Sequence, residues 1–347
     1  MRYKLLGKSG LRVSELCLGT MTFGEVWGWG ASQSESHKIF DGFVEAGGNF
    51  LDTANNYTDR TSERYVGECI ASDRAHFVVA TKYTLSMRKD DPNASGNQRK
   101  NMVQALEASL KRLNTDYIDL YWVHAWDFLT PVEEVMRGLD DLVRAGKVLY
   151  VGISDTPAWV VAQANTLAAW RGWTPFVGVQ IEYSLLQREP ERDLLPMAQA
   201  FDLAVLAWSP LAGGLLSGKY QAQQASASGE SRRMEEQEGP LLSERHTRVV
   251  KEVQAVAAEI GCTPAQVALN WLRHQAGVVI PVLGSRKVRQ LQENMDCLKY
   301  PLTRELVQRL DAASRIALGF PHDFLASDEV RELVYGGMYA LIDPHQR

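Results

Sequence analysis

Short apolar runs alternate with amphipathic stretches along nearly the whole chain of 347 residues, and this alternation limits the possible folds more than any other feature. The candidate strands lie at residues 16–18, 49–51, 77–81, 118–123, 148–154, 176–181, 204–208 and 278–282. Nearly continuous apolar strands are typical of parallel sheets that are covered on both faces. These eight strand–helix units therefore predict one α/β domain over residues 1–347, a closed parallel (β/α)8 TIM barrel.

The stretches between the strands carry helical signals. Met102, Leu106 and Leu113 have the spacing of one helix face. Two segments, 130–133 (Thr-Pro-x-Glu) and 263–266 (Thr-Pro-x-Gln), read as capping boxes with proline at the first helical position, so each predicts a helix start. No Gly-x-Gly-x-x-Gly motif follows the first strand, which argues against a Rossmann fold.

Three segments fall outside the strand–helix pattern. Residues 4–13 predict a small β-hairpin that covers one end of the barrel. Residues 221–242, rich in Gln, Ser and Glu, predict a long mobile loop. Residues 319–347 mix glycine, proline and aromatic residues, and we expect this C-terminal tail to fold over the barrel mouth.

The overall charge and the cysteines exclude several classes of protein. A formal net charge of −5 argues against a general nucleic-acid binder or a membrane-surface protein. No segment approaches the roughly 18 apolar residues of a membrane span, and no secretory signal follows Met1, so a cytoplasmic protein is expected. Cys17, Cys69, Cys262 and Cys297 lie far apart, which predicts reduced thiols rather than disulfides or a zinc site.

Four polar side chains are predicted at or just after the ends of three successive strands. Asp52, Lys82 and His124 follow the apolar runs directly, and Tyr57 lies five residues beyond Asp52. The active site of a (β/α)8 barrel lies at this end of the strands, so the four are expected in one cleft. A lysine beside a tyrosine favours the phenolate and lowers the tyrosine pKa, and an aspartate would hold that lysine charged. Neutral His124 would then donate a hydrogen bond to a substrate oxygen.

Each of these residues also has an ordinary structural explanation when taken alone. Asp52 would cap a turn, and Lys82 would lie at the barrel rim with its charge in solvent. His124 would fill the core, and Tyr57 would be a surface aromatic residue. Their occurrence together at successive strand ends favours the catalytic interpretation. A metal site on Asp52 and His124 is weaker, because further ligands are missing and Lys82 would repel the cation.

Six motifs spread over nearly the whole chain resemble those of the aldo-keto reductases. They lie at residues 50–57 (FLDTANNY), 79–82 (VATK), 116–124 (DYIDLYWVH), 142–148 (LVRAGKV), 208–220 (WSPLAGGLLSGKY) and 284–294 (GSRKVRQLQEN). The resemblance implies reversible NADPH-dependent reduction of an aldehyde or ketone. Tyr57 would be the general acid, and Asp52, Lys82 and His124 would complete a catalytic tetrad.

The resemblance also implies positions for NADPH. Trp208 would stack on the nicotinamide, and Ser154, Asp155 and Gln180 would face its carboxamide. Arg286, at a helix start, suits a 2′-phosphate, which favours NADPH over NADH. The remaining implied contacts along the pyrophosphate and at the adenosine end are Ser209, Leu211, Lys219, Arg232, Gly284, Ser285, Gln290, Glu293 and Asn294.

Aromatic residues on the loops at the mouth suggest a pocket for an apolar or ring-bearing carbonyl compound. The candidates for substrate contacts are Trp27, Trp29, Tyr83, Trp126 and Phe128, with Phe320 or Phe324 from the tail. Simple packing would equally explain any one of these aromatic residues.

The sequence departs from the common family pattern at two places. Asp155 stands where asparagine is usual, and an ionised carboxylate cannot donate to the carboxamide oxygen. Tyr57 is followed by Thr58 and Asp59 where a glycine is frequent.

Two alternative functions stay open at this stage. One is a slow-turnover NADPH-binding partner protein that resembles the potassium-channel β subunits, and the other is a metal-dependent barrel hydrolase. The substrate and the oligomeric state are not predicted.

Overall fold

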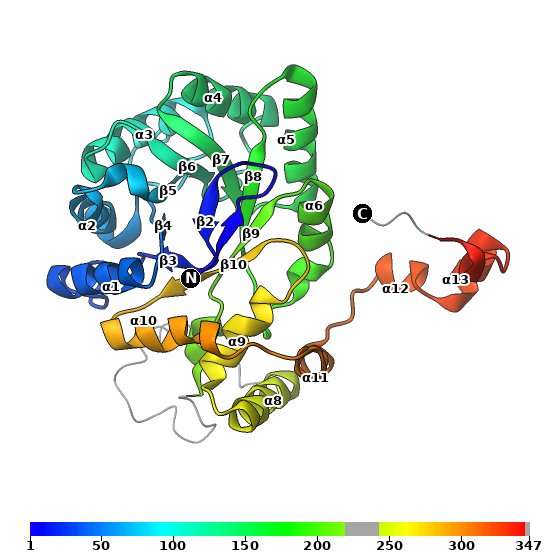
Figure 1. The fold of residues 1–347 in the computed structure, drawn as a ribbon. Helices are drawn as coiled ribbons and strands as arrows, with labels where there is room; N and C mark the ends of the chain where they lie inside the picture. Colours follow the sequence, from blue (N-terminus) through cyan, green and yellow to red (C-terminus); the bar gives the residue numbers. More distant parts are fainter. Residues whose placement is uncertain (219–242, 344–347) are drawn as a thin grey trace.

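The computed structural model describes residues 1–218 and 243–343, and these residues form a closed barrel (Figure 1). Its strands are β3 (Cys17–Gly19), β4 (Phe50–Asp52), β5 (Val78–Tyr83), β6 (Ile118–Val123), β7 (Val148–Ser154), β8 (Phe176–Glu182), β9 (Ala204–Trp208) and β10 (Val279–Gly284). Neighbouring strands are all parallel, and β10 closes the ring against β3. The predicted (β/α)8 barrel is therefore confirmed, with small shifts in the strand bounds. Residues 221–242, expected as a mobile loop, lie outside the described residues.

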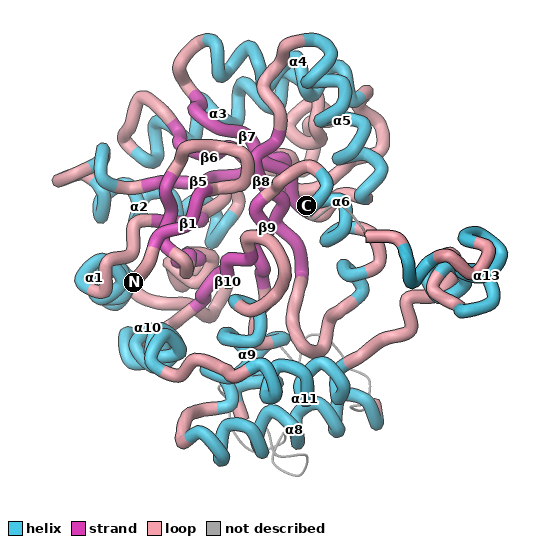
Figure 2. The backbone as a smooth tube through the Cα atoms, turned by 45° about the vertical axis from the view of Figure 1, so that its right-hand side comes forward, coloured by secondary structure: helices cyan, strands magenta, loops and turns pink. Residues whose placement is uncertain are grey.

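Helices surround the barrel, as both ribbon views show (Figure 2). Their bounds are α1 (Gln33–Glu45), α2 (Thr61–Ile70), α3 (Arg99–Leu113), α4 (Val132–Arg144), α5 (Ala158–Arg171), α6 (Leu194–Ala200), α8 (Glu244–Ile260), α9 (Pro264–Arg273), α10 (Val288–Met295) and α11 (Arg304–Ser314). The predicted apolar face of α3 is fully buried at Met102, Leu106 and Leu113. No helix among the described residues is long and apolar enough to span a membrane.

The N-terminal hairpin contributes buried side chains to the inner core of the barrel. Strands β1 (Tyr3–Leu5) and β2 (Arg12–Ser14) pair antiparallel, as predicted. Leu6 and Val13 are fully buried and pack with apolar side chains from several barrel strands, including Trp122 of β6. Glycine is required beside Trp122, because a Cβ atom at Gly152 would lie 2.3 Å from the indole ring. The hairpin and the indole thus fill the barrel and leave the strand ends at the mouth for polar residues.

One predicted capping box forms and the other does not. In α9, Thr263 and Gln266 cap each other reciprocally, with Pro264 at the first position. In α4, by contrast, the N-cap is Pro131 and makes no side-chain cap. The Thr130 hydroxyl instead donates to Asp127 Oδ2 at 2.7 Å, so a carboxylate outside the predicted box binds this threonine.

The C-terminal tail does not fold over the mouth of its own barrel. Helices α12 (His322–Leu325) and α13 (Asp328–Tyr335) stand away from the barrel in both views (Figures 1 and 2). Arg188 and Arg245 bind Ser314, the last residue of α11, through its hydroxyl and its carbonyl oxygen. These two bonds fix the place where the tail leaves the barrel, so Phe320 and Phe324 are exposed and do not line the mouth.

Candidate active site

The four predicted tetrad residues meet at the mouth of the barrel. Lys82 Nζ donates to Asp52 Oδ2 at 2.5 Å, to the carbonyl oxygen of Thr53 at 2.8 Å and to the Tyr57 hydroxyl at 3.0 Å. An ammonium group has three protons, so all of them are used and the orientation of the group is fixed. The His124 ring stands edge-on to the Tyr57 ring, with the centroids 5.9 Å apart.

The parallel register of the strands explains this arrangement. Asp52 is the last residue of β4 and pairs with Ala80 of β5, which places Lys82 two residues further along on the same face. Lys82 pairs in turn with Trp122 of β6, and His124 lies two residues beyond that position. Three side chains from neighbouring strands therefore point toward the same point without any contribution from a flexible loop.

Tyr57 is aimed by a strained turn. It begins the 3₁₀ helix η1 (Tyr57–Arg60), in which Thr58, Asp59 and Arg60 all have positive φ, at 44°, 48° and 74°. Thr58 is fully buried, and its hydroxyl donates to the carbonyl oxygen of Phe23 while it accepts from the Ser62 amide. The position where a glycine is frequent in the family thus takes a left-handed conformation with threonine, which two hydrogen bonds hold in place.

The charges in the site set the proton positions. Burial disfavours the charge on Lys82, but Asp52 and Tyr57 together outweigh burial and raise the lysine pKa above its ordinary value. Burial also raises the pKa of Tyr57, and Lys82 lowers it by less. The expected net lowering of the tyrosine pKa is therefore wrong for this structure, although Lys82 acts with the expected sign. Burial together with Lys82 lowers the pKa of His124 to about 3, so the imidazole is neutral at physiological pH.

Asp52 has a second partner that the sequence did not indicate. Gln180 of β8 donates its amide nitrogen to Asp52 Oδ1 at 3.0 Å, so both carboxylate oxygens are bound. We expected Gln180 to face the cofactor carboxamide. Its Oε1 atom keeps its acceptor capacity, while its nitrogen fixes the aspartate that holds Lys82.

Asp155 and Trp208 form a pair at the ends of β7 and β9. Trp208 Nε1 donates to Asp155 Oδ1 at 3.0 Å. Asp155 has a φ of 42°, and burial raises the pKa of its carboxyl group. The carboxylate at this unusual position thus serves as an acceptor for the indole, a role that an asparagine oxygen would also fill.

The predicted adenosine end lies around the start of α10. The side chain of Gln290 accepts from the backbone amide of Arg286 at 3.0 Å, two residues before the helix begins. The Glu293 carboxylate accepts from Arg289 at 2.8 Å, a neighbour that the sequence analysis did not consider. Asn294 is buried in the same helix, and Gly284 is the last residue of β10.

Three buried polar atoms at the predicted cofactor and substrate positions lack a hydrogen-bond partner among the described residues. They are Ser154 Oγ, Ser285 Oγ and His124 Nδ1. A buried polar atom without a partner is costly, so these atoms fit a bound polar ligand. Ser209, with a φ of 51°, and Leu211 precede the 3₁₀ helix η4 (Ala212–Ser217), whose positive-φ turns suit an anion. Lys219 and Arg232 lie outside the described residues.

The mouth aromatics differ in their placement. In the loop after β3, the ring centroids of Trp27 and Trp29 lie 5.6 Å apart. Trp126 packs partly against the core, and Phe128 is exposed. Tyr83 is fully buried, stacks on Tyr121 and donates its hydroxyl to a backbone oxygen. The prediction that Tyr83 lines the pocket is not met, because residues alternate along β5 and the inward position belongs to Lys82.

A buried asparagine that the sequence analysis missed supports the substrate side. Asn97 and Asp127 bind each other reciprocally, since each backbone amide donates to the other side chain at 2.7 Å. The Asn97 amide nitrogen also donates to the Ala125 carbonyl oxygen. The loop that carries Trp126 and Phe128 is therefore tied to the loop after β5. Asn97 stands in a polar stretch without a recognisable motif, so the sequence offered no signal for it.

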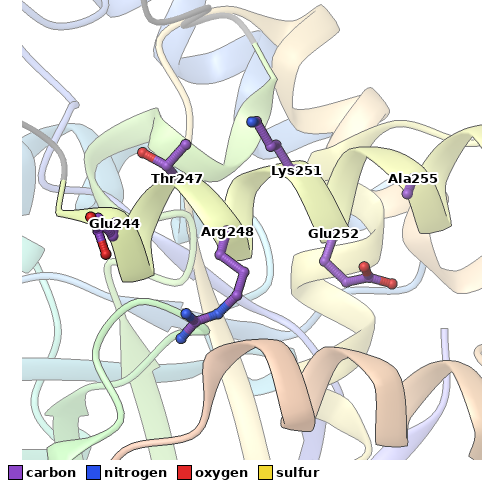
Figure 3. A pocket seen from close by; sticks show the side chains of 6 residues that line it. All are labelled: Glu244, Thr247, Arg248, Lys251, Glu252 and Ala255. Carbon is purple, nitrogen blue, oxygen red and sulfur yellow. The ribbon is translucent and has the colours of Figure 1, made fainter.

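A surface hollow elsewhere is separate from this site. It is lined by six side chains of one helix, α8, as Figure 3 shows: Glu244, Thr247, Arg248, Lys251, Glu252 and Ala255. None of these residues belongs to the tetrad or to the predicted cofactor contacts, so the hollow has no part in the candidate active site.

Comparison with known proteins agrees with this geometry. The profile of the Aldo/keto reductase family matches residues 15–315, and the chain belongs to this family. It is therefore an NAD(P)H-dependent oxidoreductase, and the predicted class of enzyme and NADPH cofactor are confirmed at the level of the family.

Two relatives are similar over more than four fifths of their own length. Norsolorinic acid reductase of Aspergillus flavus is 41% identical over 92% of this chain and 83% of its own. An NADP(+) aryl-alcohol dehydrogenase of Phanerodontia chrysosporium is 40% identical over 90% of this chain and 86% of its own.

Proposed function

We propose that this protein reduces a ring-bearing aldehyde or ketone to the alcohol, with NADPH as reductant and Tyr57 as the general acid, and that the reaction is reversible. The observation that carries the proposal is the Tyr57 hydroxyl, bound at 3.0 Å by the buried ammonium of Lys82. When bound, NADPH supplies a hydride to the carbonyl carbon. Trp208, Ser154 and Gln180 would hold its nicotinamide end, and Ser285 and Arg286 its adenosine end.

Tyr57 is suited to deliver the proton that the carbonyl oxygen needs. Its raised pKa keeps the phenol protonated at neutral pH. When the O–H bond of Tyr57 breaks and the proton passes to the substrate oxygen, the electron pair stays on the phenolate oxygen. That new negative charge lies against Lys82, which stabilises it where water is excluded. A positioned acid of this kind contributes about 10²–10⁴ in rate.

His124 and Asp52 support this transfer without exchanging protons themselves. Neutral His124 has one N–H donor for the substrate oxygen, which it would orient toward Tyr57. Asp52 keeps Lys82 charged through the 2.5 Å ion pair. The tetrad thus holds one transferable proton, on Tyr57.

The aromatic residues at the mouth favour a ring-bearing substrate. Trp27, Trp29 and Phe128 lie on loops around the strand ends, and large apolar side chains bind flat apolar groups. The relative named aryl-alcohol dehydrogenase is consistent with an aromatic substrate class.

Replacing Tyr57 with phenylalanine tests the proposal. We expect Tyr57→Phe to lose at least about 10²-fold in kcat with a panel of aromatic aldehydes, because the proton donor is gone. The Kd for NADPH, followed by tryptophan fluorescence, should stay unchanged. Tyr65→Phe, on α2 away from the tetrad, is the matched control and should keep full activity.

Two outcomes would contradict the proposal. Carbonyl reduction within ten-fold of the unmodified enzyme in Tyr57→Phe would exclude Tyr57 as the acid. Oxidation of only one NADPH per unmodified chain, with every aldehyde tested, would favour the slow-turnover binding protein instead.

A further inference from the structure

The C-terminal tail presents an unusually large apolar surface. Ten of its large apolar side chains are each at least 41% exposed. Phe320 and Leu333 reach 84% and 78%. A contiguous exposed apolar patch above a few hundred Å² is rare on a monomer and marks an interaction site.

The tail is nevertheless an ordered unit. Ser327 caps α13, and Asp323 accepts from the Gly319 amide at 2.8 Å. The Tyr335 and Tyr339 rings pack 4.9 Å apart. Among the described residues, the hydrogen bonds of residues 319–343 connect only tail residues with one another. The tail is thus folded locally while its apolar side chains have no barrel to cover them.

A second unpartnered apolar surface lies on α5. The two tryptophans of its outer face, Trp159 and Trp170, are 64% and 84% exposed, and Gln163 lies between them on the same face. The adjacent helix α4 exposes Glu133, Glu134 and Arg137 instead, as expected for a helix that faces solvent. Two exposed tryptophans on one helix face are typical of a protein interface.

Both surfaces lie on the same side of the molecule. Figures 1 and 2 place α5, α6, α12 and α13 on one flank of the barrel. In a two-fold dimer one flank meets a copy of itself, so the tail of each copy can reach α5 of the other. The charges agree as well, since α13 carries three acidic residues (Asp328, Glu329 and Glu332) against one basic residue (Arg331), while α5 has no acidic residue and ends at Arg171.

We propose that the protein is a two-fold homodimer in which the tail of each copy, residues 319–343, packs on the Trp159–Trp170 face of α5 in the partner. The available area is sufficient. With about 150 Å² for a large apolar side chain, ten that are at least 41% exposed offer at least about 600 Å² per tail. If half of this area is covered on each of the two tails, and an equal area of the partner is covered with it, the dimer would bury roughly 1,200 Å² in total. This total is within the range of stable interfaces.

The mass of the full chain in solution tests this proposal, together with variants of each surface. We expect a dimer by light scattering at micromolar concentration. Trp170→Asp on α5 and Leu333→Asp in the tail should each raise the dimer Kd at least ten-fold. The control Leu149→Asp, at a residue 42% exposed near the start of β7, should leave it unchanged. All three positions are exposed, and circular dichroism will verify that each variant is folded; Trp159→Asp repeats the α5 test.

Mixing the two variants separates this arrangement from other dimers. A heterodimer of Trp170→Asp with Leu333→Asp keeps one intact contact between a tail and α5, so the mixture should contain more dimer than either variant alone. A monomeric unmodified chain, as when the tail folds onto its own barrel, would overturn the proposal. So would a variant that dimerises as well as the control, or a mixture without any gain.

Discussion

The ion pair between Lys82 and Asp52 should dominate both the stability of the site and its pH dependence, and Asp52→Asn tests this. Lys82 is fully buried, Asp52 is 2% exposed, and their polar atoms lie 2.5 Å apart. Removing one partner of a buried pair leaves an uncompensated charge and costs about 3–5 kcal/mol. The asparagine nitrogen or oxygen would in addition face Gln180, whose donor now binds Asp52 Oδ1. We therefore expect Asp52→Asn to lower the free energy of unfolding by about 3–5 kcal/mol at pH 7.

The sign of the pH dependence follows from the lysine pKa. In the unmodified protein the folded-state pKa of Lys82 is raised, so its stabilisation is complete below the unfolded pKa and is lost only as pH rises through the higher folded value. Without Asp52, burial favours neutral lysine, and we expect the folded pKa to fall below the unfolded one. The unfolded variant then binds more protons than the folded variant, so the free energy of unfolding of Asp52→Asn should rise between pH 7 and about 10. Its difference in stability from the unmodified protein should therefore shrink over this range.

Urea unfolding followed by circular dichroism measures both effects. The exposed pair of Asp296 and Lys299 gives a matched control, because Asp296→Asn removes the same charge from the surface and should cost far less than Asp52→Asn. The double variant Asp52→Asn/Lys82→Met should recover part of the loss, because no unpaired charge remains buried. A destabilisation by Asp52→Asn no greater than that of the surface control, without a rise in stability with pH, would refute the reasoning.

Two further predictions concern the neighbours of the tetrad. Asp155→Leu removes the acceptor of the Trp208 indole and should raise the Kd for NADPH about five- to ten-fold, since a hydrogen bond contributes about 1 kcal/mol; Asp155→Asn keeps an oxygen there and should change the Kd only modestly. Equal Kd values for all three proteins, measured by fluorescence titration, would show that the pair does not position the indole. Because the pKa of His124 is lowered to about 3, kcat should show no ionisation of His124 near pH 6.5, and folding stability should fall as pH drops below 6.5, where only the unfolded histidine gains a proton. A transition of kcat near pH 6.5 that disappears in His124→Gln would contradict this assignment.

The barrel and the tetrad could be predicted because their signals are local. Strand periodicity located every barrel strand, and the register of parallel strands then placed Asp52, Lys82 and His124 together. The same alternation would have excluded Tyr83 from the pocket, since adjacent residues of β5 face opposite sides.

Other features depend on contacts between distant residues. The bond from Gln180 to Asp52 spans the barrel, and the pairing of Asn97 with Asp127 joins two loops whose sequences carry no motif. The direction of the Tyr57 pKa shift depends on whether burial outweighs the nearby charge of Lys82. The spacing of residues along the chain cannot give that balance. The placement of the tail likewise depends on whether any surface of its own barrel covers it.

Backbone strain is concentrated at the mouth, and this bears on how the site is held. Most described residues other than glycine that have positive φ follow barrel strands: Thr58, Asp59, Arg60, Thr84, Phe128, Asp155, Ser209 and Ala212. Left-handed conformations cost roughly 1–3 kcal/mol each and persist only where surrounding structure fixes them. Here hydrogen bonds provide that restraint: Thr58 donates to Phe23, Thr84 accepts from Asn97, and Asp155 accepts from Trp208. The parallel barrel supplies the stability that allows these turns, and the turn after β4 gives Tyr57 a direction that a regular strand cannot.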